Sequence, residues 1–143
     1  MARHYPLNPG VEPPVAVRHA AFSLWVLGGL YAFHGAYVCH IGPANERAAE
    51  SFWLYPVIVG AVLVVVTWTG SVVRQGGRLI GAVVVALVLL GCGAIGGVFA
   101  AKSKEIRTDH APFVILEVAI VLWALVTLIL LERARHDRKH LRL

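Results

Sequence analysis

The sequence predicts an all-α integral membrane protein, a single domain (1–143) with four transmembrane helices in an up-down bundle. Four long stretches, residues 19–45, 51–73, 79–101 and 110–131, contain one charged residue between them, Glu117. About 20 apolar residues cross the roughly 30 Å hydrocarbon core of a bilayer, so each stretch is long enough to span it. Hydrophobic residues make up 58% of the chain, whereas soluble domains have about 45–50%.

Lysine and arginine are distributed unevenly between the two ends of this predicted bundle. Nine of the 13 lie in the N-terminal arm, the second loop and the C-terminal tail, and four lie in the other two loops. By the positive-inside rule, both termini are expected in the cytoplasm, with the chain in the plasma membrane. Topology and anionic membrane lipids explain the net charge of +5, so nucleic acid is not an expected partner.

The first two predicted helices cover about 20–41 and 53–73. A Pro-rich arm, 1–18, precedes the first helix, which should stop where Pro43 ends the ladder of backbone hydrogen bonds. Pro56 falls in the first turn of the second helix, where its missing N–H is tolerated. The loop after this helix is short, so the second and third helices are expected to be antiparallel neighbours.

The third and fourth predicted helices cover about 79–101 and 113–131. Pro112 lies at the start of the fourth helix, a position that suits proline. The basic tail, 132–143, is expected to continue this helix beyond the membrane. Its positive charge anchors the topology and allows contact with anionic lipid.

Small residues at helical spacing indicate close helix packing. They are Gly28, Ala32 and Ala36 in the first helix and Gly93 and Gly97 in the third. Small side chains let helix backbones approach closely in lipid, where apolar surface alone gives no driving force for association. The pattern favours packing inside one bundle, and a homo-oligomer is the alternative.

His34 and Glu117 are the polar residues most out of place in the predicted spans. At 1.5 Å per residue, each lies about 8–10 Å below the outer surface, so they are expected to meet or to share a water, supported by Tyr31 or Tyr37. Such a pair can share one proton. It is either a structural clasp between helices or a site that handles protons, and the sequence favours the clasp because no further ionisable groups extend a path across the bilayer.

Other chemistry has weaker signals. Haem would need two histidines facing one cavity at similar depth, and His34 is the one that lies clearly within a span. Histidine, cysteine and acidic residues of the outer rim lack the spacing of a metal site, so neither a metal nor a cofactor is expected. No nucleophilic triad, phosphate loop or paired-carboxylate motif is present, so an enzyme is not expected.

The expected function is that of a non-catalytic accessory or assembly subunit of a larger membrane complex, such as a respiratory one. Membrane lipids and other membrane subunits are its expected partners. The first alternative is a small oligomeric proton-coupled transporter or channel that uses Glu117. In size and in its single membrane carboxylate the chain is loosely similar to small multidrug-resistance transporters, but theirs is in the first helix, where this chain has His34 instead. The second alternative is a haem- or quinone-binding electron carrier.

Overall fold

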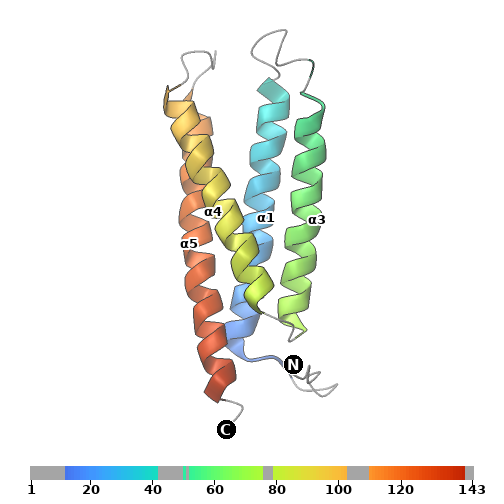
Figure 1. Cartoon of the computed structure of the whole chain (residues 1–143), viewed down its shortest axis with the longest axis vertical. Coiled ribbons are helices and arrows are strands. Elements are labelled where there is room, and N and C mark those ends of the chain that lie inside the picture. The colour runs from blue at the N-terminus through green and yellow to red at the C-terminus, as the bar shows by residue number, and fades with distance from the viewer. Residues whose placement is uncertain (1–11, 42–49, 51, 76–78, 103–109, 141–143) are drawn as a thin grey trace.

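The computed structural model describes residues 12–41, 50, 52–75, 79–102 and 110–140. This part of the chain forms a bundle of long helices that lie side by side (Figure 1). The helices are α1 (Val15–Ile41), α3 (Leu54–Arg74), α4 (Leu79–Lys102) and α5 (His110–His140). Their directions alternate, so α1 begins and α5 ends at the same end of the bundle. The predicted all-helical bundle of four helices is therefore confirmed.

The first and last helices are longer than the sequence predicts. α1 begins at Val15 rather than near residue 20, because the carbonyl of Pro14 accepts hydrogen bonds from Val17 N at 2.9 Å and Arg18 N at 3.1 Å. The last residues of the predicted arm, 1–18, are thus helical. At the other end, α5 continues without a break to His140, so the described part of the basic tail extends this helix as expected.

The helices do not pack as a symmetrical square. α1 packs on both α3 and α5, α4 packs mainly on α5, and α3 and α4 contact each other little. In Figure 1, α4 starts beside the end of α3 and leans away from it toward α5. The expected antiparallel neighbours therefore meet only near their connecting loop. A short loop holds two helix ends together, but the tilt of each helix depends on the side chains along its length.

Two clusters of buried apolar residues form the core. One occupies the half of the bundle where α1 begins, and its members are mainly small or β-branched: Val17, Ala20, Ala21, Leu24, Val73, Ala82, Ala86, Leu131 and Ala134. The second consists of Leu27, Val66, Leu89, Ile120 and Ala124. The hydroxyls of Ser23 and Thr127, 2.7 Å apart, join α1 to α5, and Trp123 Nε1 donates to the carbonyl of Ser23 at 3.1 Å. Small side chains and these bonds let α1 and α5 pack closely.

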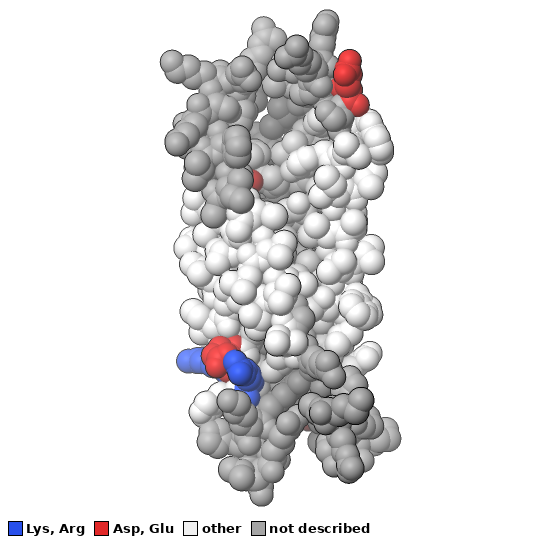
Figure 2. Space-filling view, viewed as in Figure 1, with Lys and Arg blue, Asp and Glu red and all other residues white. Residues whose placement is uncertain are grey.

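The outer surface of the bundle is strongly apolar. Ile80, Val64 and Trp68 are 73%, 70% and 68% exposed. On the face shown in Figure 2, the charged side chains of the described residues lie mainly near the two ends of the bundle. Three helical segments are long and apolar enough to cross a membrane, namely Val15–His40, Leu54–Arg74 and Pro112–Asp137. In α4 the described apolar segment, Ala82–Gly93, is shorter.

Candidate functional site

The polar centre of the bundle is a contact between His34 of α1 and Glu117 of α5. His34 Nε2 lies 2.8 Å from Glu117 Oε1, and each residue is only 5% exposed. The two side chains come from helices that pack directly on each other. An ionised carboxylate in such a place is unfavourable unless it is paired or neutralised, and the imidazole is positioned to do either.

Tyr55 adds a third helix to this contact. Its hydroxyl, on α3, lies 3.3 Å from His34 Nδ1, within the range of a weak hydrogen bond. The two ring nitrogens of His34 therefore face groups on two different helices. Around them, the ring of Phe113 lies 5.0 Å from the imidazole and that of Tyr31 lies 6.4 Å away in a stacked orientation. The result is a polar network that joins α1, α3 and α5 inside an apolar shell.

The network leaves hydrogen-bonding capacity unused. His34 Nε2 is close to Glu117 Oε1 but is not aligned for a regular hydrogen bond, and Glu117 Oε2 has no partner among the described residues. Gly93 of α4 faces this oxygen, since a Cβ added there would lie 3.5 Å from it. A buried carboxylate oxygen without a donor is one that can carry a proton or accept a bond from water. Within the described residues, the arrangement therefore leaves one buried oxygen of Glu117 free to accept a hydrogen bond.

The supporting tyrosine differs from the sequence-based expectation. Tyr31 and Tyr37, on the same helix as His34, were expected to complete the network, but the hydroxyl next to the imidazole is that of Tyr55. Tyr31 contributes ring packing, and Tyr37 lies half-buried near the end of α1. Tyr55 was not predicted from the sequence as part of this network. The available signal was that α3 begins in the half of the bundle that contains His34, within reach of a long tyrosine side chain.

The close contact between α1 and α3 is made by glycines. A Cβ at Gly28 would lie 3.2 Å from Val66 Cγ1, and one at Gly35 would lie 2.7 Å from Val59 Cγ1. Two of the other small residues predicted to pack against a helix are less buried: Ala32 is half-buried and Ala36 is exposed. Gly35, which was not among the predicted packing residues, allows a closer approach to α3 than Gly28 does.

In α4, Gly93 packs on α5, where its Cβ would lie 3.1 Å from Val121 Cγ2. This contact brings the backbone of α4 close to Glu117. Gly97 also lies in α4, but its surroundings fall outside the described residues.

A metal or haem has no ready-made site in the described part of the bundle. No group of three His, Cys, Asp or Glu side chains among those residues is arranged to hold a metal ion. Ligation of haem iron by His34 would require one of its ring nitrogens to leave Glu117 or Tyr55. The residues present thus fit a polar contact between helices better than a metal centre.

Comparison with known proteins found no relative of this chain. No protein-family model, curated protein or solved structure matches the chain. A functional assignment therefore depends on the residues described above.

Proposed function

We propose that this chain is an integral protein of the plasma membrane, with four spans and both ends in the cytoplasm, and that it serves as a non-catalytic accessory or assembly subunit of a larger membrane complex. The observation that carries the proposal is the contact of His34 with Glu117. These two interior ionisable groups bind each other across α1 and α5, with a 2.8 Å contact and 7% exposure of each side chain. Their role is then to fix helix packing, and the outer surface is left for partners.

Membrane placement is supported by the distribution of side chains. Large apolar residues are exposed along α3, α4 and α5, where water would make them unfavourable. The described charged residues lie mainly at the ends of the bundle in Figure 2. Nine of 13 basic residues fall on the side that holds both termini, which supports a cytoplasmic location for that side.

The surface available to a partner helix is the side where α3 and α4 diverge. His34 is buried, so it lies inside the bundle and does not contribute to that surface. α3 and α4 instead expose large aliphatic residues, with Val65 47% and Leu87 51% exposed. In the proposal, another membrane subunit covers this side, and membrane lipids cover the rest.

Cross-linking in the native membrane tests this proposal. A photoreactive residue at Val65 or Leu87 is expected to give one discrete adduct with a different protein, and purification in mild detergent is expected to recover that protein in stoichiometric amount. The matched control is a photoreactive residue at Ile129 of α5, which is 60% exposed and should give no such adduct. Recovery of the chain alone or as a homodimer, with no adduct to another protein, would contradict a subunit role.

A second candidate function, proton-coupled transport, is favoured by one observation, the unpartnered Oε2 of buried Glu117. A coupling carboxylate must exchange a proton as the protein moves between states. In sealed vesicles, Glu117→Gln would abolish pH-driven flux of a transporter while leaving the helical content intact. If the chain is a subunit, the same variant changes assembly or stability, and the purified wild-type protein shows no flux to lose.

A further inference from the structure

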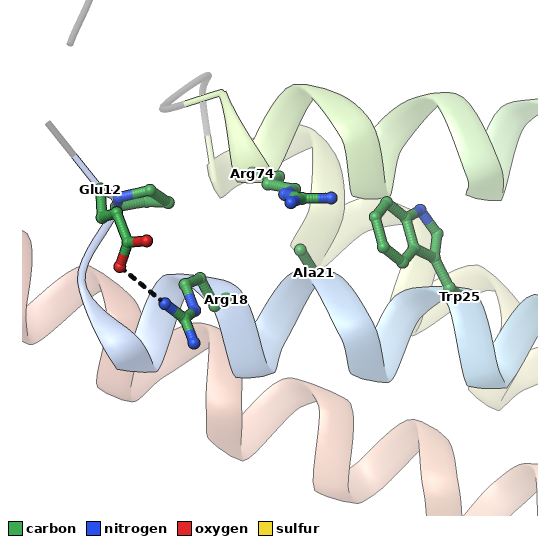
Figure 3. Close-up of a pocket in the computed structure, with 6 residues that line it drawn as sticks. Glu12, Arg18, Ala21, Trp25 and Arg74 are labelled. Carbon is green, nitrogen blue, oxygen red and sulfur yellow. Dashed lines mark hydrogen bonds and ion pairs between the residues drawn. The ribbon is translucent and has the colours of Figure 1, made fainter. Parts of the chain in front are cut away.

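An open cleft lies at the end of the bundle where α1 begins and α3 ends. It has a volume of about 200 Å³ and is lined by Glu12, Pro13, Arg18, Ala21, Trp25 and Arg74 (Figure 3). A hollow of about 400 Å³ adjoins it and shares Pro13, Trp25 and Arg74. Ser71 and Gln75 complete the lining of this second hollow. Together they form a groove between α1 and α3, which we name the inner groove.

Two guanidinium groups from different helices border the inner groove. The Cζ atom of Arg74 lies 5.8 Å from the centre of the Trp25 ring, a cation–π distance that orients this arginine toward α1. Arg18 contacts Glu12 at 3.0 Å, but the two side chains are 50% and 85% exposed. A salt bridge so exposed to water contributes little, so Arg18 can exchange Glu12 for another anion. The groove therefore has a cationic mouth.

The groove changes from cationic to apolar along the bundle axis. Beyond the arginines, the indole of Trp25 lies against α3, where its Nε1 donates to the carbonyl of Thr67 at 3.3 Å. A Cβ at Gly70 would overlap this indole, so the glycine makes room for it. Further along the same two helices, Phe33 and Val64 are 63% and 70% exposed. This order of charge, aromatic ring and aliphatic surface matches the headgroup, interface and acyl chains of a phospholipid.

We propose that the inner groove binds the phosphate headgroup of an anionic phospholipid, with the phosphate between Arg18 and Arg74 and the acyl chains along α1 and α3. A planar guanidinium binds two phosphate oxygens at once, which suits this ligand. A free phosphate would use the cationic mouth alone, whereas a lipid also covers the apolar surface beyond Trp25. The inference rests on the proposed membrane location, but not on the identity of any partner protein.

Lipid binding to the purified full chain in detergent tests this site. The probes are phosphatidylglycerol, phosphatidylcholine with the same acyl chains, and inorganic phosphate. Native mass spectrometry and the lipid-dependent rise in melting temperature give the affinity. Phosphatidylglycerol should bind more tightly than phosphatidylcholine, and Arg18→Gln or Arg74→Gln should each weaken its binding about fivefold. Arg135→Gln is the matched control, because Arg135 is a 59% exposed arginine at the same end of the bundle but outside the groove.

Three results would overturn the proposal. They are equal binding of the two lipids to the unmodified chain, an equal effect of Arg135→Gln and the groove variants, and full displacement of phosphatidylglycerol by inorganic phosphate at the same concentration. The first comparison needs no variant, so it decides the matter even if an arginine replacement prevents folding. Selective lipid binding by a chain that recovers no partner would refute the subunit role and leave the lipid site standing. Recovery of a stoichiometric partner, together with equal binding of the two lipids, would support the subunit role and refute the lipid site.

Discussion

His34 of α1 and Glu117 of α5 place Nε2 and Oε1 2.8 Å apart, with each side chain only 7% exposed. Arg18 and Glu12 approach almost as closely, at 3.0 Å, but their side chains are 50% and 85% exposed. The two contacts have similar lengths in different surroundings. Water screens the charges of the exposed pair, whereas the interior strengthens the attraction of the buried pair and makes the loss of either partner unfavourable.

This difference predicts unequal effects of removing one partner from each pair. His34→Leu should lower the free energy of unfolding by about 3–5 kcal/mol, because Glu117 is left buried without its partner. Arg18→Gln should lower it by about 1 kcal/mol or less, because that pair is exposed. Unfolding of each variant by sodium dodecyl sulfate in mixed micelles, followed by circular dichroism, provides the comparison. Equal losses of stability in His34→Leu and Arg18→Gln would show that burial of the His34–Glu117 pair is unimportant.

The close approach of α1 and α3 at Gly35 predicts sensitivity to a single methyl group. A Cβ there would lie 2.7 Å and 2.9 Å from the two Cγ atoms of Val59, so Gly35→Ala should push the helices apart and lower stability by about 1–3 kcal/mol. Gly29→Ala is the control on the same helix, because no described atom lies within 4 Å of its added Cβ. That change should be neutral or stabilising by up to about 1 kcal/mol. Thermal melts of both variants distinguish packing from helix propensity. Adding Val59→Ala to Gly35→Ala should partly restore the lost stability, because it removes the side-chain atoms that the new Cβ meets.

The hydroxyl of Tyr55 predicts a small, specific loss on its removal. Tyr55→Phe keeps the ring but deletes the group 3.3 Å from His34 Nδ1, so stability should fall by about 0.5–1.5 kcal/mol. Tyr37→Phe is the control, because the Tyr37 hydroxyl makes no hydrogen bond to another described residue. Equilibrium unfolding under one set of conditions measures both variants. A larger loss of stability for Tyr37→Phe than for Tyr55→Phe would contradict this prediction and would favour Tyr37 as the supporting tyrosine.

The proposed topology predicts which sites a membrane-impermeant thiol reagent reaches in intact cells. In a background with Cys39→Ala and Cys92→Ala, Glu50→Cys should react from outside. Glu12→Cys and Asp137→Cys, at the opposite end, should react only after the membrane is opened. The reason is the excess of basic residues on the side of the termini. Labelling of Glu12→Cys and Asp137→Cys from opposite sides would rule out an even number of spans.

The sequence predicted most of the fold because hydrophobic length is a strong signal. Runs of apolar residues gave the existence and order of all four helices. Helix ends were less accurate: α1 starts earlier because Pro14 accepts bonds from its first turn, and the charges of the tail do not stop α5. Hydropathy reports which residues tolerate lipid, whereas backbone hydrogen bonding decides where a helix ends.

The candidate site was predicted in part, since depth along a helix follows from residue counting. Equal depth placed His34 and Glu117 at one level, and in the structure these side chains are in contact. Tyr55 and Gly35 were missed because rotation and tilt decide which faces meet. The divergence of α3 from α4 was missed for the same reason. Such arrangements depend on packing between distant segments, which a single sequence does not reveal.

A double-mutant cycle on His34 and Glu117 tests the central claim, that this buried pair joins α1 to α5 as one unit. The free energy of unfolding is measured for the wild type, His34→Leu, Glu117→Leu and the double variant under identical conditions. Each single variant should lose about 3–5 kcal/mol, while the double variant should recover much of that loss because no ionisable group remains buried alone. A coupling energy of about 2 kcal/mol or more is expected. Losses that add to within about 0.5 kcal/mol would contradict the claim, since independent sites behave in that way.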